Sequence, residues 1–238
     1  MKRLAWASLV LLAVVSGCSR PAETSKSAAP AAPAAPAVER AGPVRWNAAM
    51  SAFELNGKPV KALKLWTFDG STEGFTPVGS KVSPAPGSGL SVLIADPTLR
   101  SPKGLNVPGG QYSLVLVRLT RTQAGGPWDG ALYYSTAAHG ETINFFGKPR
   151  SGADPKVGET TTLVYDMSKQ AAGGADWTQS VIDQLRLDLE DRPGGGFLIR
   201  QVAIAEDPEA AAGPPAAAAA AAPAPPPEAA SKSPKPKS

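Results

Sequence analysis

The strict alternation of leucine with polar residues at positions 184–190 limits the fold of this chain more than any other feature of its sequence. Every second residue there is leucine, and the residues between the leucines are polar or charged. Successive side chains of a β-strand point to opposite faces of a sheet, so the pattern predicts a strand buried on one face only. We expect the leucines in a core and Arg186, Asp188 and Glu190 facing outward.

Similar strand-like stretches recur along the chain, separated by clusters of glycine and proline. The predicted strands are residues 63–68, 90–94, 112–121, 131–135, 143–146, 161–167 and 197–204. The predicted turns are residues 84–87, 108–110, 125–127, 173–174 and 193–196. Only residues 177–181 suggest a short helix. Many short strands with such turns predict an all-β fold, an antiparallel β-sandwich or jelly roll.

Composition divides the chain into four segments. Residues 1–17 are a candidate signal peptide, and residues 45–206 contain nearly all the aromatic residues and fit one domain. Residues 18–44 and 207–238 are rich in alanine and proline. Such segments cannot bury a core, so we expect an extended linker before the sandwich and a disordered tail after it.

The N-terminus has the form of an export signal. Lys2 and Arg3 precede an apolar run at residues 4–15, which is shorter than the roughly 20 residues of a membrane-spanning helix. The small residues before Cys18 resemble the lipobox of bacterial lipoproteins. The resemblance implies acylation of Cys18, with chains such as palmitate, and stable attachment to a membrane of the cell envelope. Ser19, where some inner-membrane lipoproteins carry aspartate, favours the outer membrane. The alternative is an ordinary secretory signal with a chance cysteine.

Charge and cysteine content argue against nucleic-acid binding and against a disulfide. The formal net charge of +4 falls to +2 when Lys2 and Arg3 leave with the signal, and no dense basic stripe with interleaved aromatic residues occurs. The sequence therefore does not predict nucleic-acid binding. Cys18 is the single cysteine, so its acylation leaves no thiol for a disulfide, and the domain has to be stable through its core alone.

The sequence does not predict an enzyme. His139 is the only histidine, no G-x-S-x-G motif occurs, and a site with several histidine ligands is excluded. Asp188, Glu190 and Asp191 lie along one predicted strand, whereas glycoside hydrolysis needs two carboxylates across a cleft. We expect His139 in a surface loop between strands.

Residues 65–75 resemble the first motif of galactose-binding-like jelly rolls. That motif is roughly W-x-F-D, a few polar residues and E-G-W, and this chain has LWTFDGSTEGF, with Phe75 in place of the last tryptophan. Later segments agree in order, at residues 89–92, 96–97, 112–122, 131–134, 177, 182–187 and 196–199. The resemblance covers about residues 62–205 and implies a carbohydrate-binding module or another non-catalytic accessory domain.

The resemblance also implies a candidate site for a structural calcium ion, which this family often binds through acidic side chains near the first strand and in the last one. Asp69 and Glu73 are the candidate ligands at the first position. The last strand has residues 199–201, Ile-Arg-Gln, where an acidic residue is usual, and this departure argues against the ion. The alternative is that Asp69 and Glu73 are turn residues with exposed carboxylates. No other cofactor is expected.

A glycan site in such a module uses an aromatic ring and polar side chains on a sheet face or on the edge loops. Arg186 and Asp188 are expected to share an outer face, and Arg118 and Thr120 could join them from a neighbouring strand. The candidate carbohydrate-binding residues are Arg118, Trp128, Tyr134, Arg186 and Asp188, with Trp177 as a second aromatic choice. The alternative is that the charges are ordinary cross-strand pairs and that the rings pack in the core.

Two hypotheses about function follow from these features. The first is a lipid-anchored, non-catalytic envelope protein whose jelly roll binds carbohydrate. The second is a structural or interaction lipoprotein that docks an envelope protein complex or the cell wall and binds no sugar. The tail, which ends in Lys232, Lys235 and Lys237, is a candidate contact with peptidoglycan or another anionic partner.

Overall fold

The computed structural model describes residues 37–85, 89–150 and 154–210. Cys18 and the tail lysines lie outside these ranges, so the predicted lipidation and tail contacts lie outside the described residues. Within them, no helix has both the length and the apolar character needed to cross a membrane.

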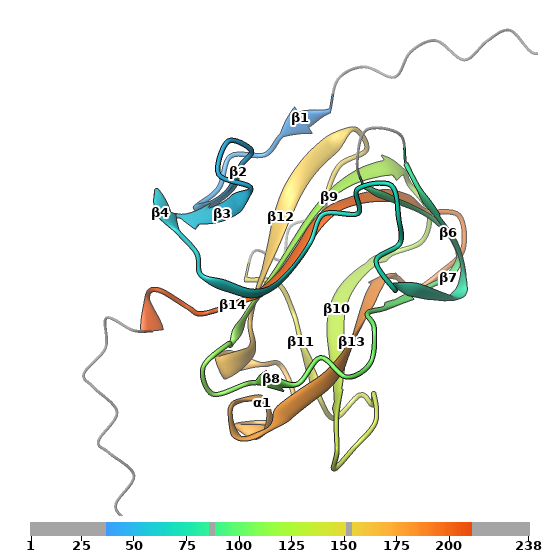
Figure 1. Ribbon diagram of the computed structural model, residues 1–238. Helices are drawn as coiled ribbons and strands as arrows, with labels where there is room; N and C mark the ends of the chain where they lie inside the picture. Colours follow the sequence, from blue (N-terminus) through green and yellow to red (C-terminus); the bar gives the residue numbers. More distant parts are fainter. Residues whose placement is uncertain (1–36, 86–88, 151–153, 211–238) are drawn as a thin grey trace, which may run out of the picture. The chain divides into compact units, whose positions relative to one another are not determined.

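The described chain is almost entirely β-structure (Figure 1). The strands are β1 Val38–Glu39, β2 Val44–Asn47, β3 Ala52–Leu55, β4 Lys58–Pro59, β5 Ala62–Trp66, β6 Thr76–Pro84, β7 Leu90–Arg100, β8 Val107–Pro108, β9 Leu114–Gln123, β10 Trp128–Thr136, β11 Phe146–Gly147, β12 Glu159–Asp166, β13 Val181–Glu190 and β14 Gly196–Ala205. The helical elements are the 3₁₀ turn η1 Met167–Lys169 and the single-turn helix α1 Asp176–Gln179. The predicted all-β sandwich is confirmed.

Two layers of strands face each other across one core. One layer, the β9 sheet, contains β1, β12, β9, β14 and β5, and the other, the β13 sheet, contains β13, β10, β11 and β8. Strand β7 joins the layers, because residues 90–93 pair with β14 and residues 98–100 pair with β13. Strand β6 pairs along β7 as the second arm of a hairpin. All of these pairs are antiparallel except that of β1 with β12, which is parallel.

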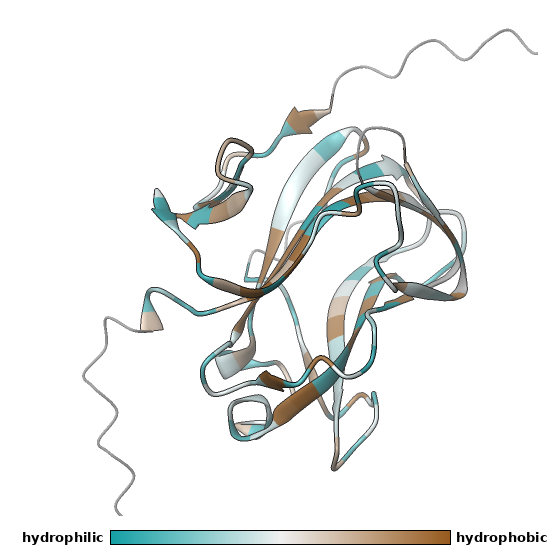
Figure 2. Cartoon of the chain, viewed as in Figure 1, coloured by the Kyte–Doolittle hydropathy of each residue, from teal (hydrophilic) through white to brown (hydrophobic). Residues whose placement is uncertain are grey.

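The core lies between the two sheets and contains the leucines that the alternation at residues 184–190 predicts there. Leu185, Leu187 and Leu189 are each no more than 2% exposed. Hydrophobic and hydrophilic residues alternate along β13 from Leu185 onward (Figure 2). Trp177 in α1 is fully buried, and its indole N–H donates to the carbonyl oxygen of Tyr112 at 3.0 Å. The alternating faces therefore create the core, and Trp177 of α1 packs into it.

A second, smaller sheet covers part of the outer face of the β9 sheet. Strands β2, β3 and β4 form an antiparallel meander. Its buried residues share a second apolar cluster with the outer face of β9, β12 and β14; the cluster contains Val44, Phe53, Leu55, Val60, Leu114, Leu116, Val164, Ala203 and Ala205. The outward residues of β9 and β14 are apolar here because a third layer buries them.

The structure differs from the sequence predictions at several elements. The strand predicted at residues 143–146 begins only at Phe146, and Ile143 is 75% exposed in the preceding loop. The sequence does not predict the short strands β1, β2, β3, β4 and β8 or the hairpin arm β6. Val38 and Glu39, in the predicted linker, pair with β12, and Asp207, in the predicted tail, is buried beside Arg150. Strand pairing therefore continues before residue 45, and side-chain burial continues after residue 206.

Candidate ligand-binding face

The structure separates the five candidate carbohydrate-binding residues. Arg186 and Asp188 lie together on the outer face of the β13 sheet, as predicted. Arg118 lies on the outer face of the other sheet, where it pairs with Glu39 at 2.6 Å. The expectation that β9 neighbours β13 is wrong, because β10 and β7 occupy both sides of β13.

The two aromatic candidates face the interior. Tyr134 has no exposed surface and packs edge-on against Trp177, with ring centroids 5.0 Å apart. Trp128 is partly buried against the core, and its ring centroid lies 6.1 Å from that of Phe197. Tyr134 and Trp177 are therefore core residues, which is the packing alternative that the sequence left open for them.

A single row of side chains crosses the outer face of the β13 sheet. The strand register places Thr76 opposite Arg100, Arg100 opposite Arg186, Arg186 opposite Tyr133 and Tyr133 opposite Phe146. The row therefore runs through β6, β7, β13, β10 and β11. It places two arginines next to each other, which is unfavourable for a sheet unless another group compensates.

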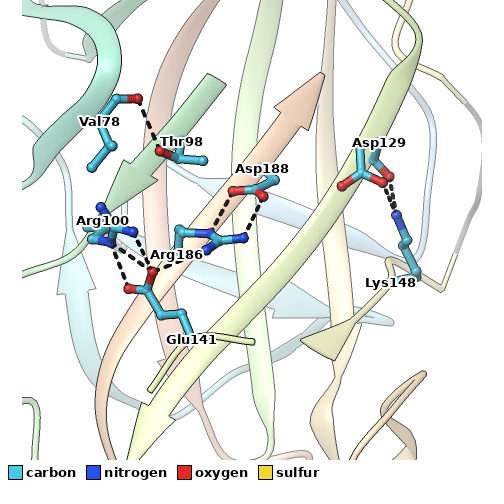
Figure 3. A network of polar contacts seen from close by, with 8 residues as sticks. All are labelled: Val78, Thr98, Arg100, Asp129, Glu141, Lys148, Arg186 and Asp188. Atoms are coloured by element: carbon cyan, nitrogen blue, oxygen red, sulfur yellow. Dashed lines mark hydrogen bonds and ion pairs between the residues drawn. The ribbon is translucent and has the colours of Figure 1, made fainter. Parts of the chain in front are cut away.

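Glu141, from the loop after β10, supplies the compensating charge. Its Oε2 lies 2.7 Å from Arg100 Nη2 and 3.3 Å from Arg186 Nη1 (Figure 3). Asp188 binds the other side of Arg186, with Nε to Oδ1 at 3.0 Å and Nη2 to Oδ2 at 2.8 Å. The guanidinium of Arg186 is thus held in one orientation between two carboxylates. We call Arg100, Glu141, Arg186 and Asp188 the four-residue network.

Burial controls the protonation of this network. Burial raises the pKa of the Asp188 carboxyl, and this effect outweighs the hydrogen bonds and charge of Arg186. Burial alone would lower the pKa of the Arg186 guanidinium, but the hydrogen bond and charge of Asp188, together with Glu141, raise it. Arg186 is therefore a fixed cation.

The other half of the row is aromatic. The Arg186 Cζ atom lies 4.1 Å from the centroid of the Tyr133 ring, within the range of a cation–π contact. The ring centroids of Tyr133 and Phe146 are 5.4 Å apart, and both side chains are partly exposed. Lys148 lies over Phe146, with Nζ 5.8 Å from its centroid, and also pairs with Asp129 (Figure 3). Charged groups thus bound both ends of the aromatic pair.

An open groove of about 760 Å³ adjoins the network at Arg100 and Glu141. Its lining is mostly polar. The lining residues are Thr76, Arg100, Lys103, Ser135, Thr136, Ala137, Ala138, His139, Gly140, Glu141, Asp183 and Gln184. The volume lies within the range of small-molecule sites, and the groove shares two residues with the network.

The predicted calcium ligands have another structural role. Glu73 Oε1 accepts hydrogen bonds from the backbone N–H of Phe68 at 2.6 Å and of Thr67 at 3.2 Å. Phe68 has a φ of 56°, so the carboxylate stabilises a turn in the left-handed region. Asp69 is exposed, and within the described ranges no cluster of three acidic, histidine or cysteine side chains could hold a metal ion. Glu73 is therefore a turn residue, but its carboxylate is partly buried rather than exposed.

Sequence reasoning missed several residues of this face, and one of them was accessible from the pattern. Leu132 and Tyr134 have the same parity on β10, so a core position for Leu132 predicts Tyr134 inside and Tyr133 outside. Glu141 and Lys148 lie in loops whose path the sequence does not specify. The pairing of Arg100 with Arg186 depends on the register of β7 and β13, which period-two alternation does not fix.

Comparisons with known proteins leave the chain without an assigned family. It matches no protein-family model, and no curated protein matches it significantly. Among solved structures, it is similar to a low-affinity xylan-binding module, CBM86, from the gut symbiont Roseburia intestinalis. The match has a TM-score of 0.39 and 14% identity and covers 63% of this chain and 98% of that module. A likeness this distant assigns neither a family nor a ligand.

Proposed function

We propose that this protein is a lipid-anchored, non-catalytic protein of the bacterial envelope whose sandwich binds neutral carbohydrate on the outer face of the β13 sheet. The observation that supports this proposal is the four-residue network, fixed beside Tyr133 and next to an open polar groove of about 760 Å³. Thr76 and Arg100 belong both to the row across the sheet and to the lining of the groove, so they connect the two.

Sugar hydroxyl groups both donate and accept hydrogen bonds, so a site for them needs oriented donors and acceptors together. The network offers guanidinium donors and carboxylate acceptors whose directions their mutual ion pairs already fix. Charge-assisted hydrogen bonds are stronger than neutral ones, and a preorganised site loses less conformational entropy on binding.

The charge balance favours an uncharged ligand. The two arginines of the network face two carboxylates, and Lys148 faces Asp129. The face therefore has no surplus charge to attract a strongly acidic or basic ligand. The partly exposed side chains of Tyr133 and Phe146 offer apolar surface for sugar C–H groups.

Binding to soluble oligosaccharides tests the proposal. We would titrate the domain with cello-, xylo-, manno- and maltohexaose by isothermal calorimetry. Arg186→Ala is expected to weaken binding roughly tenfold or more, because it removes charge-assisted hydrogen bonds. Arg118→Ala is the matched control, since Arg118 is also an ion-paired arginine on a sheet face, but on the opposite sheet.

Three results would contradict carbohydrate binding at this face. They are no binding of any neutral oligosaccharide by the wild type, equal binding by Arg186→Ala and the wild type, and equal losses in Arg186→Ala and Arg118→Ala. The first result would favour the alternative, a structural lipoprotein that docks an envelope complex or the cell wall. Cell-wall co-sedimentation with and without residues 211–238 then tests the contribution of the tail.

The membrane anchor rests on the sequence around Cys18. Mass spectrometry of the mature protein should find acyl chains on Cys18 as the N-terminal residue, and Cys18→Ala should leave the protein unacylated and outside the membrane fraction. Fractionation of the two membranes tests the outer-membrane location. An unmodified Cys18 in the exported protein would refute the anchor and leave the sugar-binding proposal intact.

A further inference from the structure

A largely apolar pocket of about 270 Å³ lies between the three-stranded meander and β12 (Figure 1). It is on the outer face of the β9 sheet, and the candidate carbohydrate face is on the other sheet. Its lining includes Pro43, Val44, Leu55, Arg150, Thr162 and Val164. Val44, Leu55 and Val164 belong to the second apolar cluster, so the pocket extends that cluster towards the surface.

Thr162 is the lining residue with an unsatisfied polar group. Its Oγ1 atom is buried and has no hydrogen-bond partner among the described residues, whereas the nearby hydroxyls of Thr120 and Thr160 bond each other at 2.6 Å. A buried hydroxyl without a hydrogen bond is costly, so native proteins rarely keep one. The Thr162 side chain is only partly buried, and a change of χ1 rotamer turns the hydroxyl towards an occupant of the pocket.

The described chain ends at the mouth of this pocket. Glu209 Oε1 accepts a hydrogen bond from Asn56 Nδ2 at 2.9 Å, and Glu209 Oε2 lies 3.6 Å from Arg150 Nη1. Asn56 follows the lining residue Leu55, and its N–H donates to the carbonyl oxygen of Pro43 at 2.8 Å. Glu209 therefore connects the meander side of the pocket with Arg150, and the tail starts from that point.

The first part of the tail has a composition that suits an apolar pocket. Residues 210–227 consist only of alanine, glycine and proline, and their first proline pair is Pro214-Pro215. An extended proline-rich chain covers about 3.1 Å per residue, so Pro214 lies within roughly 12 Å of Ala210. Proline rings offer apolar surface, and the carbonyl groups of a polyproline II segment have no internal hydrogen bonds. Such a carbonyl is a suitable acceptor for the Thr162 hydroxyl.

The alanine- and proline-rich linker before the domain is a second candidate occupant, but it approaches from another direction. Val38 pairs with Glu159 and Glu39 with Thr160, in parallel. The chain before Val38 therefore leads towards the start of β12, whereas the pocket lies further along, at residues 161–164. The linker would have to reverse its direction to enter, and the tail does not.

We propose that Pro214 and Pro215 dock in this pocket of the same molecule, with the Thr162 hydroxyl donating to a carbonyl group of the tail. Because the tether is short, the effective concentration of the proline pair is in the millimolar range, and a modest intrinsic affinity keeps it bound. Docking fixes the start of the tail on the meander side of the domain. The proposal is independent of carbohydrate binding, since the β13 face stays open.

Amide chemical shifts in the full chain without its signal and lipid test which segment occupies the pocket. Pro214→Gly combined with Pro215→Gly should shift the amides of Val44, Leu55 and residues 162–164. The matched control, Pro225→Gly combined with Pro226→Gly, makes the same change further along the tail and should leave those amides unchanged.

Three results would overturn the docking of the tail. The first is shifts in the Pro214/Pro215 variant that stay confined to residues next to the substitutions. The second is pocket shifts that follow Pro30→Gly combined with Pro33→Gly, which would assign the pocket to the linker. The third is pocket shifts that depend on protein concentration, which would indicate a second copy of the chain.

Thermal melting of Thr162→Val tests the proposed hydrogen bond. Valine keeps the shape of the side chain and removes the hydroxyl, so the melting temperature of the wild-type chain should fall by about 2–4 °C. In the Pro214→Gly, Pro215→Gly background the hydroxyl has no tail carbonyl to bind, so the same substitution should leave the melting temperature unchanged or raise it. Equal changes in the two backgrounds would refute the contact between Thr162 and the tail.

Discussion

The buried ion pair between Arg121 and Glu190 gives a sharp prediction about stability. Arg121 Nη2 lies 2.5 Å from Glu190 Oε1, and their side chains are 9% and 0% exposed. Arg121 is on β9 and Glu190 is on β13, so the pair connects the two sheets of the sandwich. The sequence pattern predicts Glu190 at the surface, and the structure corrects this, because the end of β13 is enclosed by the turns that precede β10 and β14.

Glycines enclose the carboxylate of Glu190 tightly. The N–H of Gly126 donates to Glu190 Oε2 at 3.1 Å, and a Cβ atom at Gly125 or Gly195 would lie only 2.4 or 2.0 Å from that oxygen. Water therefore has little room to replace the guanidinium. Removing one partner of a buried pair leaves an uncompensated charge, which costs about 3–5 kcal/mol.

We predict that Arg121→Met lowers the free energy of unfolding by about 3–5 kcal/mol at pH 7. For a domain of this size, one kcal/mol corresponds to roughly 2–4 °C, so the melting temperature should fall by about 6–20 °C in calorimetry. The double variant Arg121→Met with Glu190→Leu should recover most of the loss, because it removes the unpaired charge.

Arg118→Met is the control for this experiment. Arg118 also lies on β9 and pairs with Glu39, but the Glu39 side chain is 48% exposed. Exposed pairs contribute about 0–1 kcal/mol, so this variant should melt within a few degrees of the wild type. Equal, small losses in Arg118→Met and Arg121→Met would refute the reasoning from burial.

Three further predictions concern single features of the fold. Gly109→Ala should destabilise the domain by at least about 1–3 kcal/mol in a denaturant titration, because its Cβ would lie 1.9 Å from the Trp177 carbonyl oxygen. Gly140→Ala is the control and should cost little, because no atom lies within 4 Å of the added Cβ. Hydrogen bonds from Ser168 and Arg150 outweigh burial and hold the pKa of Asp166 below its usual value. Stability from Asp166 is then fully present above the ordinary aspartate pKa and is lost as the pH falls from there through the lowered pKa of the folded state. Asp166→Asn should therefore be destabilising at pH 7 and much less so at pH 2, and an equal effect at both would contradict this. Chelation with EDTA should leave the melting temperature within about 1 °C of its value without EDTA. Removal of a structural calcium ion would instead lower the melting temperature, because such an ion contributes to folding.

The parts of the fold that the sequence predicts are those where one residue type repeats with a fixed period. The leucines of β13 predict a half-buried strand because their alternation with polar residues arises within one strand and does not depend on which strands pair with it. Strand β7 is different, since one half pairs with each sheet. Asp96-Pro97 lies between the two halves, but these residues do not specify which strand each half pairs with. Long-range register of this kind depends on the whole assembly of strands.

The candidate face shows the same limit. Arg186 and Asp188 are neighbours on one strand, so alternation places them together. Glu141 reaches Arg186 across 45 positions of sequence through a loop, and no periodic signal predicts that contact. Residue type cannot distinguish Tyr134 from Tyr133, whereas the parity of Leu132 on the same strand does. Tertiary contacts, rather than local pattern, determine which polar residues form a surface.

Mapping of ligand contacts by ¹H–¹⁵N chemical-shift changes tests whether the outer face of the β13 sheet binds carbohydrate. The domain would be titrated with the neutral hexasaccharides, and the Arg186 Nε–H signal would be followed together with the backbone amides. We predict the largest shifts at residues 98–100, 131–135, 139–141 and 184–188. Shifts concentrated around Arg118 on the opposite sheet, or no shifts with any of the sugars, would contradict the assignment of this face.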